Sequence, residues 1–475
     1  MNNKPIMVHN TLNNTKMEFK TIEPGKVKMY VCGPTTYNYI HLGNARPIVV
    51  FDTIRRYLTY RGYEVTYIQN FTDVDDKIIK RAHEENDDPI KLAARYIDEF
   101  FKDVNALNVL PASTYPKVSE HMQEIITFVQ DIINAGYGYE LDGDVYFSVR
   151  KYEEYGKLSG RNLDDMQAGA RVDVDGRKQD PMDFALWKSA KPGEPAWDSP
   201  WGPGRPGWHI ECSAMSRKYL GDQFDIHGGG QDLIFPHHEN EIAQTECVTG
   251  KPMANYWLHN GFITINSEKM SKSLGNFFLL REILEKFDSE TVRFYLLSVQ
   301  YRSPLDFDDE KLQVAQKGLE RLKNCYTAMM NGLKTASADN TAEGAELLNK
   351  VNAVEEAFQD AMNDDFNTAL ASAALFDMAR EINTYLKQDV LDKTALQKAA
   401  DVYTALLNIM GLDFAADNGA NDGLVDDLMN LLIDLRKQAR AEKNYAMADQ
   451  IRNQLNEIGV VLEDTKQGTT WKLAR

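Results

Sequence analysis

Two polar residues in the segment HLGN have types and a spacing that suit phosphate chemistry. His41 and Asn44 are three residues apart, so on a helix both side chains lie on one face. Gly43 between them lets a ligand approach the backbone closely. Because a helix N-terminus that follows a parallel strand attracts anions, these donors can hold phosphate oxygens while charge shifts in a transition state. Taken alone, His41 is more simply an ordinary surface residue at the start of a helix.

A second candidate motif is the pentapeptide KMSKS at residues 269–273. Its two lysines, Lys269 and Lys272, are three residues apart, and Gly275 follows. This composition is typical of a mobile cationic loop that closes over a pyrophosphate leaving group, each ammonium acting as a point charge. By itself the pentapeptide is also consistent with a solvated run of charge.

Four residues have the chemistry of a metal site. Cys32 follows a predicted strand, and Cys212, His237 and Glu241 lie much later in the chain. Thiolate, imidazole and carboxylate ligands together suit Zn²⁺. His237 and Glu241 are four residues apart, which makes them neighbours on a helix. The spacing is a weak signal, since nearby histidines compete: His209, His227 and His238. His238 is the closest rival, with support of a ligand or packing on the sheet as its alternative role.

The segments around these motifs predict alternating strands and helices. Residues 27–35 form a short apolar run that ends at a Gly-Pro turn, and residues 64–72 are β-branched and aromatic. Between them, residues 45–62 have apolar positions at helical spacing. A further helix follows, with Asp73 or Asp75 near its N-cap. This order predicts an α/β fold with a doubly wound parallel sheet.

The rest of the chain divides by composition. Residues 111–206 contain a helix, a hairpin-like stretch and too many prolines for a central strand, which indicates an insertion into the sheet domain. Beyond Asp308 the pattern is almost entirely helical, with polar linkers at 331–344 and 413–423. We expect these segments: 1–110 and 207–262 as the two halves of the sheet domain, 111–206 as the insertion, 263–315 around KMSKS, 316–412 as a helical domain, and 424–475 as a small C-terminal subdomain.

Length and composition describe a soluble globular protein. The chain has 475 residues with 43% hydrophobic and 26% charged residues, and roughly three domains are expected. Four scattered cysteines do not make a disulfide framework, no signal peptide begins the chain, and no apolar run is long enough to span a membrane. These features predict a cytoplasmic protein.

The formal net charge of −18 argues against a nucleic-acid partner, but it is a sum that can hide a local basic region. Residues 433–475 contain eight basic and six acidic residues. Trp471 among them has two alternatives, stacking on an unpaired base or packing in a small core.

The HLGN and KMSKS motifs together resemble the paired signature of class I aminoacyl-tRNA synthetases. Four longer segments resemble the cysteinyl-tRNA synthetase family: YVCGPTTYNYIHLGNARP, NFTDVDDKIIKRA, GWHIECSAMS and IHGGGQDLIFPHHENEIAQ. The resemblance extends from about Met29 to the C-terminus. In one departure, Asn44 replaces the final histidine of the signature. Asparagine donates hydrogen bonds but does not titrate, so no protonation role is expected there.

The resemblance implies a Rossmann-like catalytic domain, a connective insertion, a helical anticodon-binding domain and the small C-terminal subdomain. It also implies roles for individual residues. Catalytic residues would be His41, Asn44, Lys269 and Lys272, of which His41, Asn44 and Lys272 would bind ATP. One zinc ion per chain would be held by Cys32, Cys212, His237 and Glu241. The amino-acid pocket would include Thr72, Trp208 and His227, and the adenosine side Gly229 and Asp232.

The expected reaction is the two-step ligation of L-cysteine to tRNA(Cys). Cysteine and ATP, with Mg²⁺, would give cysteinyl-adenylate, and the cysteinyl group would then pass to the 3′ end of the tRNA. Cysteine and serine are near-isosteres, so a thiophilic metal explains selectivity without an editing domain. We expect a monomer with no membrane association. Two alternatives remain, a small-molecule cysteine ligase of the mycothiol-pathway type and a zinc-stabilised RNA-binding protein without catalysis.

Overall fold

A four-stranded parallel sheet organises the larger of two compact units, Met1–Leu412. Its strand order is β10-β9-β3-β4. The bounds are Lys26–Val31 (β3), Glu64–Gln69 (β4), Phe224–Gly230 (β9) and Ala254–Asn260 (β10). The computed structural model describes residues 4–164, 176–265, 268–269, 277–415, 422–465 and 468–473. The predicted strands at 27–35 and 64–72 are confirmed as β3 and β4.

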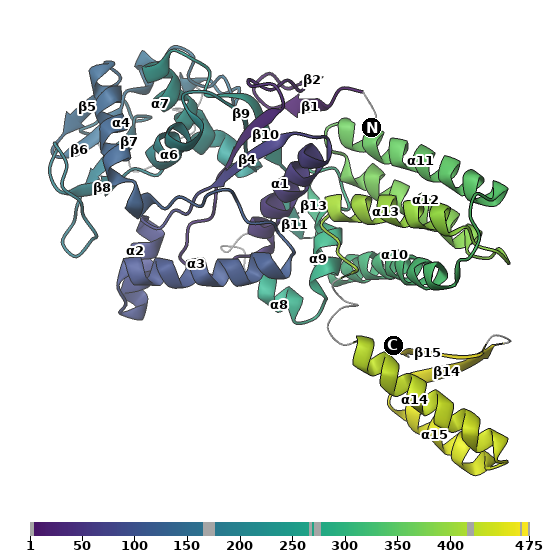
Figure 1. Ribbon diagram of the computed structural model, residues 1–475. Coiled ribbons are helices and arrows are strands. Elements are labelled where there is room, and N and C mark those ends of the chain that lie inside the picture. Colours follow the sequence, from purple (N-terminus) through teal and green to yellow (C-terminus); the bar gives the residue numbers. More distant parts are fainter. Residues whose placement is uncertain are drawn as a thin grey trace. The chain divides into compact units, whose positions relative to one another are not determined.

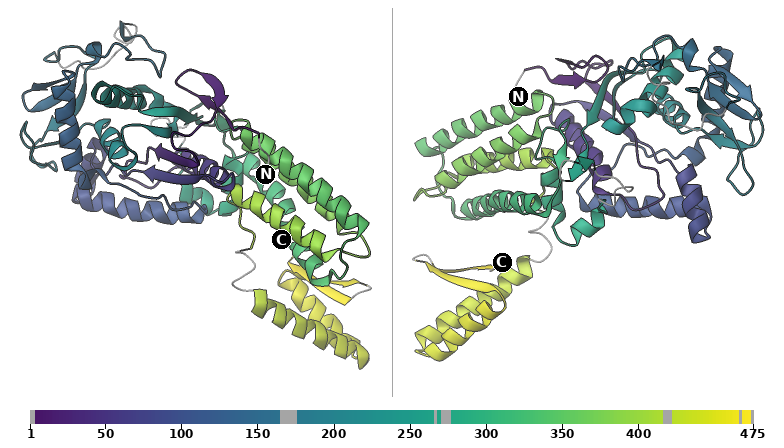
Figure 2. Two further views of the ribbon diagram at one scale, coloured as in Figure 1. Left: turned by 45° about the horizontal axis from the view of Figure 1, so that its top comes forward. Right: turned by 180° about the vertical axis from the view of Figure 1, so that it is seen from behind.

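Helices cover both faces of this sheet (Figures 1 and 2). The chain runs from β3 through α1 (Leu42–Tyr60) to β4 on one side, and later reaches β9 and β10 on the other side of β3. Because parallel crossovers are right-handed, this reversal puts α1 on one face and α6 (Ile210–Leu220) and α7 (Glu239–Thr249) on the other. The doubly wound α/β fold is therefore confirmed, and its switch point lies between β3 and β9.

Local sequence explains where the first helices begin. The His41 side chain caps α1, and Asp75 caps α2 (Asp76–Glu85) by accepting a hydrogen bond from Lys77 N. Of the two aspartates predicted near this N-cap, Asp73 has another role, because it accepts a hydrogen bond from Ser119 N at 2.9 Å. Pro89 begins α3 (Pro89–Ala106), where its missing N–H costs nothing.

The insertion between β4 and α6 contains a second, antiparallel sheet of order β5-β6-β7-β8. The hairpin expected there is present as β5 and β6. The described elements of the insertion are η1 (Val118–Glu120), α4 (Met122–Asn134), β5 (Gly138–Leu141), β6 (Asp144–Phe147), η2 (Val149–Lys151), β7 (Phe184–Ser189) and β8 (Gly204–Pro206). Its core is continuous with the residues that support the parallel sheet, Tyr30, Ile68 and Trp257 among them.

The remaining elements of the larger unit frame the sheet. An N-terminal hairpin precedes it, short turns link β9 to α7, and a helical bundle follows it, drawn green in Figure 1. They are β1 (Met7–Asn10), β2 (Thr15–Glu18), η3 (Gln231–Leu233), η4 (Ile234–His238), β11 (Ile263–Ile265), β12 (Glu268–Lys269), α8 (Leu280–Leu284), α9 (Ser289–Leu296), β13 (Leu305–Asp306), α10 (Asp309–Thr335), α11 (Ala342–Asn363), α12 (Thr368–Tyr385) and α13 (Lys393–Ile409). Among the described residues, no helix is both long enough and apolar enough to span a bilayer.

The smaller unit, Asp413–Arg475, is not purely helical. It contains α14 (Asp422–Ala441), α15 (Tyr445–Glu457) and a hairpin of β14 (Val460–Thr465) and β15 (Gly468–Leu473). Trp471 faces Leu462 across this hairpin and packs against the small core. Of its two alternatives, the structure therefore favours the core role. The basic residue Arg436 is also structural, since it is buried and forms two hydrogen bonds with Asp464.

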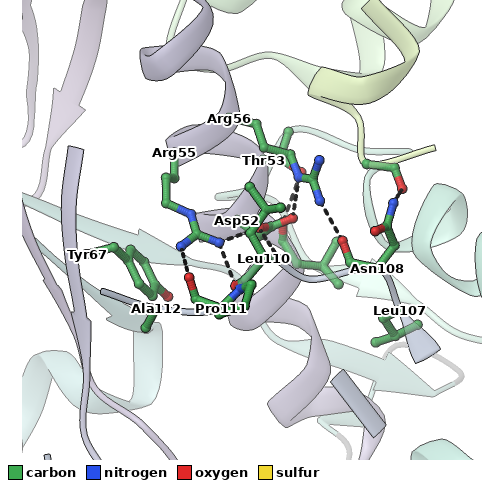
Figure 3. Close-up of polar contacts among 12 residues, drawn as sticks. Asp52, Thr53, Arg55, Arg56, Tyr67, Leu107, Asn108, Leu110, Pro111 and Ala112 are labelled. Atoms are coloured by element: carbon green, nitrogen blue, oxygen red, sulfur yellow. Dashed lines mark hydrogen bonds and ion pairs between the residues drawn. The ribbon is translucent and has the colours of Figure 1, made fainter. Parts of the chain in front are cut away.

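A buried carboxylate, Asp52 of α1, lies among arginines, and Figure 3 shows it beside Arg55 and Arg56. Asp52 on α1 forms ion pairs with Arg293 of α9 at 2.6 Å and with Arg55 and Arg56 at 2.8 Å. Arg293 also donates to the carbonyl oxygen of Met410, at the end of α13, at 2.7 Å. Burial alone would raise the pKa of Asp52, but the three guanidinium groups lower it to about 2.

Asp52→Asn should lower the free energy of unfolding by about 3–5 kcal/mol, because it leaves the buried Arg293 without a counter-charge. Denaturant unfolding at pH 7 measures this difference. The folded pKa lies below the ordinary value of 3.8, so the ionised Asp52 contributes its full stability above that value and loses it only as the pH falls towards 2. The deficit should therefore be constant between about pH 8 and pH 5. Asp98→Asn, at an exposed position on α3, is the matched control. A similar loss in both variants would contradict the role of Asp52.

Candidate functional site

A cavity of about 320 Å³ opens at the carboxyl ends of the parallel strands. This is the edge where doubly wound sheets bind ligands, next to the switch point between β3 and β9. Eight residues with a predicted catalytic, binding or metal role line it: Cys32, His41, Asn44, Thr72, Trp208, Cys212, Asp232 and His237. Segments more than 200 residues apart in the chain therefore meet around one space.

Four potential metal ligands lie together on the wall of this cavity. The ligand atoms of Cys32, Cys212, His237 and Glu241 all lie within 4.8 Å of one another. The two sulfurs are 3.8 Å apart, and His237 Nε2 is 3.0 Å from Glu241 Oε1. Two zinc-bound sulfurs in a tetrahedral site are also about 3.8 Å apart, given Zn–S bonds of about 2.3 Å. The donor types and their separations therefore fit a zinc ion.

A second set of donors overlaps the first, because Cys32 and Glu241 also lie near His227 and His238. The first set includes three residues on the cavity wall, Cys32, Cys212 and His237. His227 and His238 are fully buried and are not among the lining residues. A metal ion that also binds a small molecule in the cavity must be reachable from the cavity, and the first set of donors therefore fits it better. This geometry favours His237 over its rival His238.

The buried histidines support the ligands of the first set. His227 Nε2 donates to Glu241 Oε2 at 2.9 Å, and the two Nδ1 atoms of His209 and His237 are 2.9 Å apart. Burial would raise the pKa of Glu241, but the charges of His227 and His237 lower it to about 2, so the carboxylate is ionised at neutral pH. Burial opposes ionisation of Cys212 as well, yet the hydrogen bond from Cys32 lowers its thiol pKa to about 6. Such outer contacts orient metal ligands.

The HLGN segment forms a capping box at the start of α1. Asn44 N donates to His41 Nδ1, and His41 N donates to Asn44 Oδ1, each at 3.2 Å. Since Nδ1 accepts a hydrogen bond, a neutral His41 ring carries its proton on Nε2. The same arrangement uses the oxygen of Asn44 and leaves its NH₂ group as a donor. Both residues line the cavity, so it has two side-chain donors beside a helix N-terminus.

The segment after KMSKS is fastened to the same place. Leu42 N donates to Phe278 O at 3.2 Å, and Leu280 N donates to Ile40 O at 3.0 Å. The Phe277 ring meets the His41 ring edge to face, with centroids 5.3 Å apart. Lys269 ends β12, and Lys272 lies outside the described residues. Residues 277–280, which follow KMSKS in the sequence, therefore lie beside HLGN.

Of the residues expected around the amino acid and the adenosine, some line the cavity and others lie behind its wall. Thr72 is buried on the cavity wall, and Trp208 packs against His237 with ring centroids 4.5 Å apart and ring planes tilted by 30°. Asp232 lines the cavity and is exposed. His227 and Gly229 lie behind this wall: His227 contacts Glu241, and a side chain at Gly229 would meet His238.

Sequence reasoning missed several residues of the site. Glu211 is buried and accepts a hydrogen bond from Thr72 Oγ1 at 2.8 Å, and burial raises the pKa of its carboxyl. Lys77 at the start of α2 lines the cavity, as does Asn70. Their signals were present in GWHIEC and in NFTDVDDK, but no spacing rule links them to the motifs. His259 was also missed, although it lies within residues 207–262, which were expected to form the second half of the sheet domain.

Three family models match successive parts of the chain. The model described as "tRNA synthetases class I (C) catalytic domain" matches residues 18–317, the "DALR domain" matches 357–415, and the "Cysteinyl-tRNA ligase anticodon binding domain" matches 423–471. A cysteine–tRNA ligase of Heliobacterium modesticaldum is 60% identical and covers 99% of this chain and 100% of its own length. One from Pelotomaculum thermopropionicum is 57% identical, covering 98% of this chain and 99% of its own.

Solved structures with the same fold are more distant in sequence. Mycobacterium tuberculosis methionyl-tRNA synthetase in complex with methionyl-adenylate has a TM-score of 0.57 at 15% identity, covering 81% of this chain and 89% of that one. A LeuRS–tRNA–LeuAMS complex from Agrobacterium radiobacter K84 has a TM-score of 0.62 at 12% identity, covering 85% and 87%. At this identity the likeness shows the class I fold.

Gly33→Ala should lower the free energy of unfolding by about 1–3 kcal/mol, since overpacking forces the backbone to shift. A methyl group on Gly33 would lie 1.6 Å from the carbonyl oxygen of Asn70, so the ends of β3 and β4 must separate. Thermal or denaturant unfolding measures the loss. Gly176→Ala is the control, because a side chain there meets nothing within 4 Å. Equal stability of the Gly33 variant and the wild type would show that the strand ends yield freely.

Proposed function

The chain belongs to the cysteine–tRNA ligase family, and we propose that the cavity at the carboxyl ends of β3, β4, β9 and β10 activates its L-cysteine. The family joins cysteine to tRNA at the expense of ATP. The observation that carries the proposal is that a cluster of soft metal donors and two phosphate donors face one cavity. The first group, with Cys32 and Cys212, suits the side chain of the substrate, and the second, with His41 and Asn44, suits ATP.

Zinc is the metal that this donor set fits, held by Cys32, Cys212, His237 and Glu241. When bound, it supplies a thiophilic acceptor that prefers the sulfur of cysteine to the hydroxyl of serine. The remaining selectivity comes from the chain itself. Trp208 and Thr72 close the wall beside the donors, and Glu211 holds the Thr72 hydroxyl through a hydrogen bond. We place the substrate's amino and carboxylate groups on this side of the cavity.

In the first step the carboxylate of cysteine attacks the α-phosphorus of ATP, a P–O bond forms, and the bond to pyrophosphate breaks. His41 donates through Nε2–H and Asn44 through its amide, so the transferring phosphate meets neutral donors. Lys269 and Lys272 would neutralise the charge that builds on the pyrophosphate, with Mg²⁺ accompanying ATP. Asp232 lines the adenosine side in this scheme, and Gly229 lies behind the wall there. No covalent bond between enzyme and substrate is needed, and catalysis rests on positioning and electrostatics.

In the second step a hydroxyl of the terminal adenosine of tRNA(Cys) attacks the carbonyl carbon of cysteinyl-adenylate, and AMP leaves. The DALR and anticodon-binding matches cover the helical and C-terminal parts, which a small-molecule cysteine ligase would not need. The division into segments at 110, 206, 262, 315 and 412, a monomeric state and a cytoplasmic location remain our proposals.

Purified protein, loaded with zinc, should exchange pyrophosphate into ATP only when cysteine is present, and should charge tRNA(Cys). Serine should support exchange far more weakly than cysteine, because it lacks the thiol that the donor cluster selects. Radiolabelled exchange and acid-gel analysis of the tRNA measure the two steps. Exchange without charging would favour a small-molecule ligase, and tRNA binding without exchange would favour a non-catalytic RNA-binding protein.

Cys212→Ser should lose zinc and, with it, the preference for cysteine. Structural zinc ligands determine affinity, so we expect at least a 100-fold weaker zinc affinity in chelator competition. Cys247→Ser is the matched control, because Cys247 is half-buried, donates to Gln244 O and belongs to neither set of clustered donors. A Cys212→Ser enzyme that keeps both zinc and selectivity would contradict the proposed metal site.

A further inference from the structure

A chain of three hydrogen bonds connects the N-terminal hairpin to Cys32. His238 Nε2 lies 3.3 Å from Cys32 Sγ, and His238 Nδ1 lies 2.8 Å from His259 Nε2. His259 Nδ1 lies 2.8 Å from Thr11 Oγ1. Both rings are buried, and each uses both of its nitrogens. Thr11 follows β1, so a residue outside the parallel sheet is coupled to a cysteine at the switch point of the sheet.

The hydroxyl of Thr11 has a fixed position relative to His259. Thr11 N donates to Trp257 O at 2.9 Å, and the neighbouring Asn10 bonds the backbone of β10 twice. The contacts with Trp257 and with Asn255 secure the end of β1 to the strand that carries His259. A hydroxyl anchored in this way can act on the orientation and tautomer of the His259 ring.

The protonation state of Cys32 determines which atom donates in each of these three hydrogen bonds. When Cys32 ligates a metal, its thiol loses the proton that it otherwise donates to Cys212, and the resulting thiolate accepts hydrogen bonds. His238 must therefore present Nε2–H to the sulfur, and as a neutral ring it must accept at Nδ1. His259 then donates Nε2–H to His238 and accepts at its own Nδ1. The donor that remains for this last nitrogen is the Thr11 hydroxyl.

We propose that Thr11 is a positioning residue of the metal site, which acts through His259 and His238 to keep an N–H group directed at the Cys32 thiolate. Without the hydroxyl, His259 is free to adopt the other tautomer and His238 to turn a lone pair towards the sulfur. That lone pair would repel the thiolate and weaken its hold on the metal. The inference rests on the zinc site proposed above. It also gives His238 a role of its own, as a hydrogen-bond donor to a ligand.

The test compares zinc affinity in the full-length chain, measured by competition with a chromophoric chelator. Thr11→Val keeps the shape and removes the hydroxyl, and we expect about 10-fold weaker zinc affinity, at the lower end of the effect of outer-shell partners. Thr11→Ser should restore most of it, and Thr11→Ala should repeat the loss. Thr15→Val, at an exposed position of the same hairpin, is the control and should match the wild type.

A double-variant cycle separates this role from general destabilisation. In a His259→Leu background the series of hydrogen bonds from Thr11 to Cys32 is already broken, so Thr11→Val should cause no further loss of zinc affinity. The cobalt-substituted protein gives a second readout: the sulfur-to-cobalt charge-transfer band of Thr11→Val should move to lower energy, since the thiolate loses a hydrogen bond. Unchanged zinc affinity in Thr11→Val, or an equal loss in both backgrounds, would overturn the inference. A wild-type chain that binds no zinc would instead overturn the zinc site itself.

Discussion

The parallel pairing of β3 with β9 is the constraint on which the site depends. Met29, Tyr30 and Val31 lie opposite Ile226, His227 and Gly228, residues almost two hundred positions later. This register brings Cys32 to the start of α6, where Cys212 lies, and to the turn that carries His237 and His238. Gly228, which pairs with Val31 in this register, also leaves room for α1, since a methyl group there would lie 2.4 Å from the Phe51 ring. The close packing of α1 on the sheet and the assembly of the donor cluster thus both involve this glycine.

Two buried carboxylates, Asp52 and Glu241, each lie among basic or imidazole side chains. Asp52 is surrounded by three arginines, and Glu241 by histidines. A buried charge costs little only when its partners are fixed in place, so both carboxylates specify the orientation of the groups around them. The first orients elements that meet α1, and the second orients the rings behind the cavity. The chemistry at the cavity and the packing behind it are therefore hard to change separately.

Much of the fold followed from local pattern, because β3, β4, α1 and the hairpin of the insertion each have a clear period and clear turn residues. Local pattern placed only Cys32 and HLGN beside the end of a strand, and the family resemblance named the other predicted residues that line the cavity. The hairpin of β14 and β15 was missed, as its strands lie in a polar tail that resembles its helical neighbours. The roles of His227, His259 and Glu211 depend on contacts between distant elements, which no spacing in the chain encodes. Asp73 and Asp75 were indistinguishable as caps until their partners, Ser119 and Lys77, were known.

The ion pairs of Asp52 have a consequence for modularity. Arg293 belongs to the region after the sheet, yet it is satisfied by Asp52 from α1 and by Met410 from the end of the bundle. The carbonyl of Met410 can reach it because Gly411 follows, where any side chain would collide with the guanidinium. A catalytic fragment cut before the bundle would keep Arg293 and its ion pair with Asp52 but would lose the hydrogen bond to the Met410 carbonyl oxygen. The sheet domain of this chain therefore cannot be excised without loss of a buried contact. A helical domain exchanged between relatives would have to keep the Met410–Gly411 pair.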